Sequence, residues 1–235
     1  MSNSYFSFKQ FTIQQDKAAF KVGTDGVLLG AVADVEGTNR ILDIGSGTGL
    51  IAIMAAQRSN AEIIALEPDY ESYIQCRENI SLCPWKERIK AENMSLQEYK
   101  TSGLFDLIVS NPPYFMGSLK NPDPRKSSSR HNDSLSGNEL LTGASRLMAK
   151  GGRLQVIMPY VEGNIFIAEA NEYGFFCNNI LKIRPLPNSE IRRLILTFSR
   201  QRLKTTEKVL TIEHGKRHEF TEEYINFTKE FYLKF

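Results

Sequence analysis

Apolar residues recur along the chain in short runs, and longer segments with a helical pattern lie beside them. The runs have the length of buried strands and lie at 41–44, 61–66, 88–95, 105–110 and 153–158. The other segments predict helices at 27–35, 50–57, 69–82, 140–148 and 164–173. Strands that alternate with helices in this way are typical of a parallel sheet with helices on both faces.

The two ends of the chain have a different pattern. Alternating aromatic residues within 5–20 predict a short strand or hairpin arm. Near the other end, alternating apolar residues at 175–184 and 191–200 predict an antiparallel strand pair, followed by a short strand at 209–213 and a helix at 222–233. We therefore expect an α/β fold with a seven-stranded, mostly parallel sheet, helices on both faces and an antiparallel final strand pair.

Length and composition fit one globular domain. The chain has 235 residues, of which 41% are hydrophobic and 24% are charged, and these are ordinary values for a globular protein. We expect a single domain with an N-terminal arm and helix at 1–36, a core at 37–200 and a C-terminal extension at 201–235.

The sequence gives no signal for export, membrane insertion or metal binding. Its start lacks a basic region followed by an apolar run, and no stretch approaches the roughly 18 apolar residues that a membrane helix needs. The three cysteines have neither a CxxC nor a metal-ligand spacing, and the three histidines are scattered. We expect a cytoplasmic, reduced protein that is a monomer and binds neither metal nor membrane.

A glycine-rich loop follows the first strand of the predicted core and precedes a helix. Its sequence is Gly45-Ser46-Gly47-Thr48-Gly49. Strand, glycine loop and helix form an arrangement that binds nucleotides, because small residues let a ligand approach the backbone and the start of the helix offers free N–H groups. Leu50 stands where a dinucleotide fingerprint has its last glycine, which disfavours an NAD site.

Polar residues also end the second and third strands. Glu67 lies about 20 residues after the glycine loop, where a carboxylate binds ribose hydroxyls in nucleotide-binding folds. We favour that role over a plain strand end before Pro68. One of Glu92, Asn93 and Ser95 is expected to contact an adenine edge; the sequence does not distinguish between them, and Asn93 enters the predicted site.

Asn111-Pro112-Pro113-Tyr114 follows the fourth strand at its carboxyl end. The two prolines fix φ and remove two backbone donors, so the strand stops at a rigid backbone. The side-chain oxygen of Asn111 and the carbonyl of Pro112 can accept the two hydrogens of a planar NH2 group, and Tyr114 offers a flat face for stacking. A turn that merely ends the strand is the alternative.

Lys21, Thr24 and Asp25 belong to a turn-like stretch that precedes the first helix. Thr24 or Asp25 is a candidate N-cap for that helix. The three side chains contact a zwitterionic ligand tail, or they only cap the helix and end the preceding segment. From these residues alone, capping is the favoured interpretation.

Basic residues concentrate in two segments. The segment 181–204 has seven lysines and arginines against Glu190 alone, which predicts either a phosphate-binding surface or the solvated face of an edge strand. A long polar stretch at 117–137 predicts either a substrate-binding lid or a plain flexible loop. Its basic residues are Lys120, Arg125, Lys126, Arg130 and His131.

The order of these motifs resembles that of class I S-adenosylmethionine-dependent methyltransferases, which have a Rossmann-like fold. In that class a glycine loop follows the first strand, an acid ends the second strand, and Asn-Pro-Pro-Tyr follows the fourth. The tetrapeptide marks enzymes that methylate a planar NH2 nitrogen on adenine, cytosine, guanine or a glutamine amide. The resemblance covers nearly the whole chain.

A narrower resemblance lies in the N-terminal motif Lys21-Val22-Gly23-Thr24-Asp25-Gly26-Val27-Leu28-Leu29-Gly30. It is similar to that of the bacterial tRNA1(Val) adenine-37 N6-methyltransferase family. Arg130-His131 and the segments 220–224 and 231–233 also fit this family, although an acid is usual where Asn132 stands. The resemblance implies methyl transfer from S-adenosylmethionine to N6 of an adenine in tRNA, and the position-37 assignment rests on it alone.

The resemblance also implies the roles of individual residues. The catalytic set would be Asn111, Pro112, Pro113 and Tyr114. The cofactor would contact Lys21, Thr24, Asp25, Asp43, Gly45, Ser46, Gly47, Gly49, Glu67, Asn93 and Asn111. The RNA would contact Lys120, Arg125, Lys126, Arg130, His131, Arg192 and Arg193.

Two alternatives remain beside the tRNA adenine methyltransferase. The same motifs serve an enzyme that methylates an rRNA base or a protein glutamine amide, and the basic segments favour RNA over protein. A non-catalytic RNA-binding module on a decayed methyltransferase fold is the other alternative. The intact glycine loop, Glu67 and Asn111 argue against decay.

Overall fold

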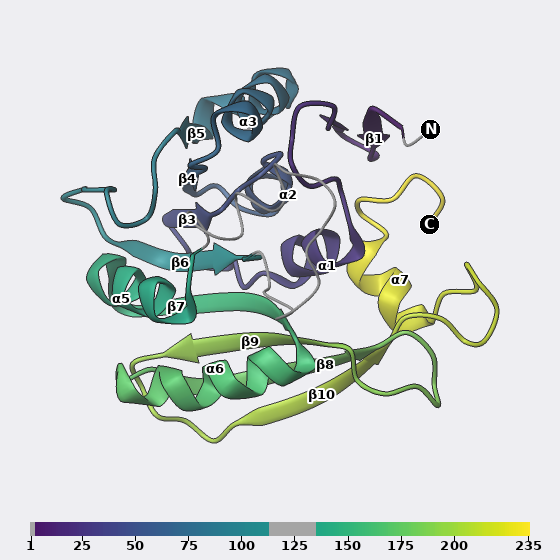
Figure 1. Ribbon diagram of the computed structural model, residues 1–235. Helices are drawn as coiled ribbons and strands as arrows, with labels where there is room; N and C mark the ends of the chain where they lie inside the picture. Colours follow the sequence, from purple (N-terminus) through teal and green to yellow (C-terminus); the bar gives the residue numbers. More distant parts are fainter. Residues whose placement is uncertain (1–2, 113–134) are drawn as a thin grey trace.

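The structure of the chain is a computed structural model that describes residues 3–112 and 135–235. Its centre is an eight-stranded sheet with the order β10-β8-β9-β7-β6-β3-β4-β5, and β1 pairs with β2 in a separate small sheet (Figure 1). The strands are β1 Tyr5–Ser7, β2 Thr12–Gln14, β3 Arg40–Ile44, β4 Glu62–Leu66, β5 Ile89–Glu92, β6 Phe105–Ser110, β7 Met148–Pro159, β8 Phe176–Arg184, β9 Arg193–Ser199 and β10 Thr206–Thr211.

The predicted fold class is confirmed, with one more strand than expected. Strands β5, β4, β3, β6 and β7 pair in parallel. Strand β9 runs antiparallel to both β7 and β8, as the alternating pattern predicted. The short strand expected at 209–213 forms β10, which adds to β8 in parallel and makes the sheet eight-stranded rather than seven-stranded. Strands β8 and β9 are therefore interior strands, which excludes the edge-strand interpretation of the basic segment 181–204.

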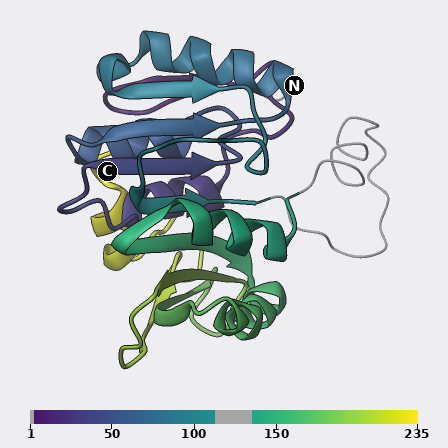
Figure 2. The same ribbon diagram turned by 90° about the vertical axis from the view of Figure 1, so that its left-hand side faces the viewer.

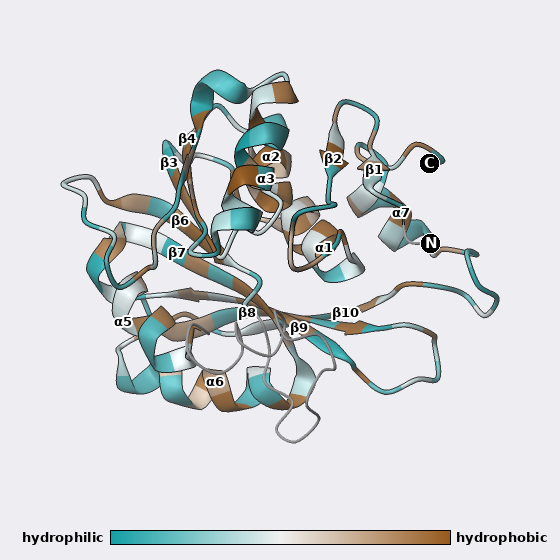
Figure 3. Ribbon diagram, turned by 45° about the horizontal axis from the view of Figure 1, so that its top comes forward, coloured by the Kyte–Doolittle hydropathy of each residue, from teal (hydrophilic) through white to brown (hydrophobic). Residues whose placement is uncertain are grey.

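Helices cover both faces of the large sheet and form two cores. Leu107 and Val109 of β6 belong to the core shared with α1, α2, α3 and α7, whereas Phe105 and Ile108 belong to the core shared with α5 and α6. The alternation from Leu107 to Val109 follows from the two-residue period of a strand. The irregular pairing between Phe105 and Leu107 interrupts it, so that Phe105 belongs to the same core as Ile108. Figure 3 shows the apolar strands β6 and β7 between the helices. The helices are α1 Thr24–Val32, α2 Leu50–Arg58, α3 Tyr70–Leu82, the short η1 Lys86–Arg88, α5 Gly137–Leu147, α6 Tyr160–Glu172 and α7 Glu222–Thr228.

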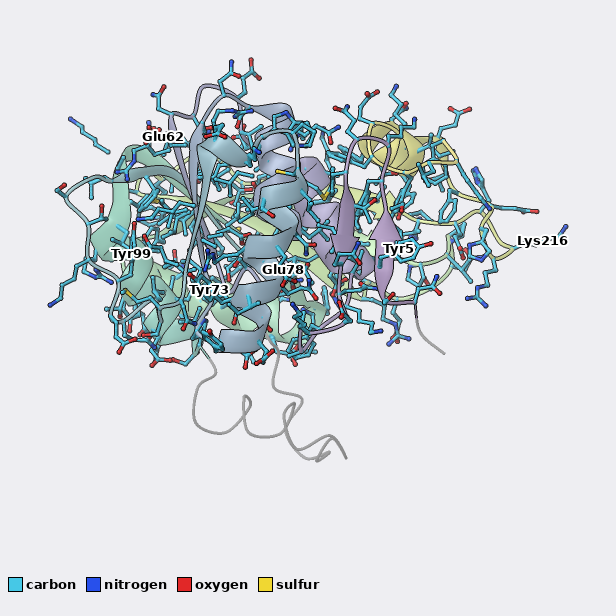
Figure 4. The ribbon with its side chains drawn as sticks, turned by 90° about the horizontal axis from the view of Figure 1, so that it is seen from above. Tyr5, Glu62, Tyr73, Glu78, Tyr99 and Lys216 are labelled. Atoms are coloured by element: carbon cyan, nitrogen blue, oxygen red, sulfur yellow. The ribbon has the colours of Figure 1, made fainter. Side chains whose placement is uncertain are left out.

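Buried polar side chains of α3 hold the N-terminal arm, which contains the predicted hairpin β1–β2. The side-chain oxygen of Asn79 accepts from the N–H of Gln14 at 2.8 Å, and the Asn79 amide donates to the Gln14 carbonyl at 2.9 Å. Glu78 pairs with Lys17 of the arm. Figure 4 shows Glu78 on the side of α3 that faces the arm carrying Tyr5. These bonds fix the chain that leads into α1.

The C-terminal extension returns to the same arm (Figure 1). The backbone N–H of Lys9 donates to the carbonyl of Phe231 at 2.8 Å. The Lys9 ammonium group donates to the carbonyls of Lys229 and Phe235 at 2.6 and 2.8 Å. Phe8 stacks on Tyr232 with ring centroids 6.0 Å apart. The first and last parts of the chain therefore support each other.

Several predicted boundaries are wrong, among them the starts of α5, α6 and β10, which lie three or four residues earlier than expected. Helix α1 begins at Thr24 instead of Val27, and its N-cap is Gly23 without a side-chain hydrogen bond, so neither Thr24 nor Asp25 caps it. Strand β7 begins at Met148, directly after α5, instead of at 153, and its pairing with β6 is irregular there. Helix α7 ends at Thr228 rather than near 233, because the chain beyond it turns back toward Lys9. No helix within 3–112 or 135–235 is long and apolar enough to cross a bilayer.

Candidate active site

The carboxyl ends of four parallel strands meet at one edge of the sheet. Ile44 of β3 lies opposite Leu66 of β4 and Ser110 of β6, and Leu66 lies opposite Glu92 of β5. The residues that follow these strand ends therefore emerge side by side, and Figure 2 shows the arrowheads of the strands on that side. Strand β4 lies on one side of β3 and β6 lies on the other, so the strand order reverses at β3. The carboxyl ends of the strands at such a switch point are where ligands bind in open α/β sheets.

The glycine loop has a backbone that requires glycine. Gly45, Gly47 and Gly49 have φ values of 70°, 54° and 80°, in the left-handed region that other residues enter at a cost. The N–H groups of Gly45 and Ser46 donate to the carbonyl of Leu66 at 2.9 and 3.0 Å. A Cβ atom placed on Gly45 or Gly47 would meet nothing within 4 Å among the described residues. The loop therefore presents open backbone at the strand ends.

Glu67 lies beneath this loop and is largely buried. One carboxylate oxygen accepts from the N–H of Gly47 at 2.7 Å, and the other accepts from the N–H of Asp69 at 3.0 Å. Burial raises the pKa of the Glu67 carboxyl to about 7, while these two hydrogen bonds oppose the rise. A carboxylate has about four acceptor positions, so the two bonds leave Glu67 able to accept from a ligand hydroxyl.

Asp43 is fully buried in β3. Its Oδ2 accepts from the N–H of Ala52 in α2 at 3.1 Å, which ties the helix to the strand across the glycine loop. Its Oδ1 has no hydrogen-bond partner among the described residues. Burial raises the pKa of the Asp43 carboxyl to about 7. A buried acceptor without a partner is costly, and a ligand donor or water at the loop would satisfy it.

Asn93 holds the turn after Glu67. Its side-chain amide donates to the carbonyls of Glu67 and Pro68 at 2.9 and 3.0 Å. Of the other two candidates for the adenine edge, Glu92 pairs with a neighbouring lysine at 2.7 Å and Ser95 bonds to Glu98 at 2.7 Å. The structure thus engages all three side chains locally, and the contact of Asn93 with a cofactor stays a prediction.

Asn111 follows β6 and lies against α1. A Cβ atom on Gly26 would stand 3.9 Å from Nδ2 of Asn111 and 3.2 Å from Cδ2 of Leu50. The hydroxyl of Ser110 donates to the carbonyl of Ile44 at 2.9 Å, which locks the end of β6 to the end of β3. Pro112 is buried. The structure therefore brings the glycine loop, the start of α1 and Asn111-Pro112 together, whereas Pro113 and Tyr114 lie outside the described residues.

Two side chains of the N-terminal motif, those of Lys21 and Asp25, have partners within the protein, and their predicted contacts with the cofactor stay a prediction. Asp25 accepts from the guanidinium of Arg193 in β9 at 2.7 Å, so a predicted cofactor residue and a predicted RNA residue form one ion pair. The two residues are 168 positions apart, and no local pattern signals their contact. The Lys21 ammonium group donates to the carbonyl of Asn3 at 3.2 Å. Thr24 is the first residue of α1.

The basic residues of the segment 181–204 are not equally available. Lys182 pairs with Glu207 at 2.5 Å, and Arg184 donates to the hydroxyl of Thr211 at 2.8 Å. Arg192, in contrast, has an exposed side chain next to Arg193. Lys120, Arg125, Lys126, Arg130 and His131 lie outside the described residues.

The geometry fits a nucleoside ligand. Open glycine backbone, the remaining acceptor positions of Glu67 and the unpartnered oxygen of Asp43 lie at one sheet edge, and Asn111 adjoins them. Within residues 3–112 and 135–235, no group of three or more His, Cys, Asp or Glu side chains could hold a metal ion. The arrangement can therefore hold a nucleoside cofactor beside a group that bonds to an amide-like nitrogen.

Comparison with known proteins shows the family to which the chain belongs. The model of the methyltransferase small domain family matches residues 17–163. A protein from Trichodesmium erythraeum (strain IMS101) named tRNA1(Val) (adenine(37)-N6)-methyltransferase is 44% identical over 240 residues, with 100% of each chain covered. A protein of the same name from Phocaeicola vulgatus is 46% identical over 233 residues, with 99% of each chain covered.

Solved structures show the same fold at lower identity. A predicted O-methyltransferase from Agrobacterium tumefaciens superposes with a TM-score of 0.66 at 22% identity, covering 88% of this chain and 96% of that chain. P. horikoshii TYW2 in complex with MeSAdo superposes with a TM-score of 0.56 at 19% identity, covering 84% of this chain and 71% of that chain. These likenesses show the Rossmann-like methyltransferase fold. Because full-length relatives share 44–46% of its residues, the chain belongs to the tRNA1(Val) (adenine(37)-N6)-methyltransferase family.

Proposed function

We propose that this protein transfers a methyl group from S-adenosylmethionine to N6 of an adenine in tRNA, namely adenosine 37 of tRNA1(Val). The observation that carries the proposal is the position of Asn111, which adjoins the glycine loop and α1 at the switch point of the sheet. Family membership supports the choice of adenine and of tRNA. The contacts between the arm and the C-terminal extension support action as a single domain.

The cofactor would be held by residues at the ends of β3 and β4. Glu67 would accept from the ribose hydroxyls with its remaining lone pairs, and the open backbone of Gly45 and Gly47 would face the ligand. Asp43 would receive a donor through its unpartnered oxygen, directly or through water. When bound, S-adenosylmethionine supplies an electrophilic methyl group. Asp25 is paired with Arg193. It would therefore hold the start of α1 in place in addition to any contact with the zwitterionic tail of the cofactor.

Asn111 and Pro112 would orient the target nitrogen. The lone pair of an adenine N6 is delocalised into the ring, which makes the amino group a poor nucleophile. Hydrogen bonds from its two N–H groups to the Asn111 side-chain oxygen and the Pro112 carbonyl would favour a more tetrahedral nitrogen, whose lone pair is then localised. They would also hold that nitrogen in line for attack, and such positioning supplies much of a catalytic rate gain. No general base is needed, because the proton can leave to water after transfer.

The target base must leave its stack to reach Asn111. Enzymes that modify a base turn it out of the helix or loop into a pocket. The phosphates of the RNA would be held by basic side chains near the site, of which Arg192 is exposed in the described part of the chain. Binding should therefore weaken as salt concentration rises.

Methylation of tRNA that lacks this modification tests the proposal. Purified protein, labelled S-adenosylmethionine and the unmodified tRNA are incubated, and the tRNA is then digested to nucleosides. We expect N6-methyladenosine from the wild type and at least about a hundredfold less from Asn111→Ala, since the variant loses the positioning of the nitrogen. Thermal unfolding of the wild type and of Asn111→Ala is the control for folding. Label in another base would exclude adenine as the target, and no label in tRNA would redirect the search to rRNA or to protein glutamine.

A further inference from the structure

The start of α6 lies at the same sheet edge as Asn111 but further out. Ser110, the last residue of β6, is opposite Val156 of β7. Strand β7 continues to Pro159, three residues further, which carries the chain roughly 10 Å beyond the end of β6. Helix α6 begins there with Tyr160.

Apolar side chains at the start of α6 face solvent instead of the core. Tyr160 is 43% exposed and Val161 is 65% exposed, and Ile165, one helical turn after Val161, is also exposed. The opposite side of the same helix supplies Phe166 to the core, where it packs against Phe198. The fold therefore does not need the exposed residues for its own packing, and a ring and two aliphatic side chains remain available at the rim of the site.

The backbone of an exposed arginine lies next to that of Tyr160. The backbone N–H of Tyr160 donates to the carbonyl of Arg192 at 3.2 Å, so the two residues are adjacent although they belong to different elements. The side chain of Arg192 is 64% exposed. Its acidic neighbour Glu190 lies 3.8 Å away and is itself highly exposed, and exposed ion pairs of this kind contribute little. The guanidinium can therefore exchange that contact for a phosphate.

We propose that Tyr160 and Arg192 form a platform for a nucleotide that flanks the target adenine, with the base stacked on the Tyr160 ring and its phosphate on Arg192. The platform rests on the proposed function, because it lies beyond the position that Asn111 gives to the target base. Unpaired bases in RNA are held by stacking on aromatic side chains together with charge from arginine. Val161 widens the apolar surface next to the ring.

The pairing of an exposed ring with an exposed cation favours RNA over a protein partner. A protein interface needs on the order of 800 Å² on each partner, and only three apolar side chains are exposed here at the start of α6. A flanking nucleotide needs one ring face and one cation, which the site provides. A base that is turned out of a loop also exposes its neighbours, so a surface that takes up a neighbour stabilises the productive complex.

Three variants and one control test the platform. Tyr160→Ala removes the ring, Tyr160→Phe retains it, and Arg192→Ala removes the cation; Tyr5→Ala removes a similarly exposed tyrosine from the N-terminal arm. We expect Tyr160→Ala to raise KM for tRNA about tenfold, since the loss of one stacking partner has that size, while Tyr160→Phe and Tyr5→Ala stay within about twofold of the wild type. KM for S-adenosylmethionine should not change. Arg192→Ala should reduce the slope of log K for tRNA binding against log salt concentration by about one, because one phosphate contact is lost.

A direct binding measurement separates failure of the platform from failure of the proposed function. The dissociation constant of a fluorescent RNA hairpin with the anticodon-loop sequence is measured for the same variants. If the wild type methylates tRNA but Tyr160→Ala matches it in KM and in hairpin affinity, the platform is wrong and the methyltransferase stands. If the wild type methylates no tRNA, the proposed function fails; equal hairpin affinity in wild type and Tyr160→Ala then overturns the platform as well, and a tenfold loss retains it as an RNA-binding surface.

Discussion

Replacement of Asn79 by alanine should disturb the cofactor loop from a distance. Asn79 is fully buried in α3. Its side chain bonds to both backbone groups of Gln14 in the N-terminal arm, and its amide also donates to the carbonyl of Thr48 in the glycine loop at 2.9 Å. One side chain thus joins the arm, α3 and the loop. Alanine would leave three backbone groups without these partners.

The magnitude follows from the three lost bonds. A typical intramolecular hydrogen bond contributes about 1 kcal/mol net, and a buried group left without a partner costs about 1–3 kcal/mol. Asn79→Ala should therefore lower the free energy of unfolding by about 3 kcal/mol, which corresponds to a fall in Tm of roughly 10 °C for a chain of this size. The bond to Thr48 concerns the loop itself, and loss of about 1 kcal/mol there weakens cofactor binding about fivefold.

Thermal unfolding and calorimetric titration with S-adenosylmethionine measure the two effects. Asn171→Ala is the matched control, because Asn171 is exposed on α6 and makes one local bond to the carbonyl of Ile167 at 3.0 Å; it should change stability by less than about 0.5 kcal/mol. A Tm for Asn79→Ala within about 2 °C of the wild type would refute the assigned bonds. A large loss of stability with unchanged cofactor affinity would refute the link between Asn79 and the glycine loop.

Two further predictions concern the loop and its acid. The pKa of Glu67 is raised to about 7, and ribose hydroxyls bond best to the ionised carboxylate, so the cofactor affinity of the wild type should fall as pH is lowered from 8 to 6. Glu67→Gln should bind the cofactor more weakly at pH 8, and its affinity should depend less on pH. An equally steep pH dependence in the variant would contradict the assignment of Glu67 to the ribose. Gly49→Ala should lower the free energy of unfolding by about 1–3 kcal/mol more than Gly37→Ala does, as measured by chemical denaturation. Both glycines have positive φ, but only at Gly49 would the new Cβ meet a neighbour, Sγ of Cys76 at 2.8 Å. Equal losses would show that the loop shifts to relieve this contact.

The strand ends that carry the chemistry could be predicted because their signals are local. Glycines at 45, 47 and 49 permit the left-handed backbone that the loop adopts. The Pro-Pro sequence after Asn111 predicts the end of a strand, and β6 ends at Ser110. The alternation of apolar runs with helical segments predicts the α/β class in the same way. Each of these features depends on φ, on a missing donor or on a short period, so neighbouring residues are enough to specify it.

The start of α1 could not be predicted in this way, because its glycines are needed for close packing against residues far away in the sequence. Within 21–30 they resemble a turn, yet Gly26 and Gly30 lie inside the helix. A Cβ atom on Gly30 would stand 2.7 Å from the sulfur of Met54 in α2, and one on Gly26 would approach Leu50 and Asn111. Small residues are needed there for the close approach of two helices and the strand end, which a local pattern does not reveal.

The sequence by itself determined the succession of strands and helices along the chain, the glycine loop, the acid after the second strand and the asparagine after the fourth. The tertiary structure decided which of them meet: parallel pairing in register sets the ends of β3, β4 and β6 side by side, and β9 brings Arg193 to Asp25. It also decided that β10 joins the sheet and that Tyr160 and Arg192 share the rim. The physical reason is that local conformation depends on neighbouring residues, whereas these contacts join residues far apart in the chain whose proximity only sheet order and register fix.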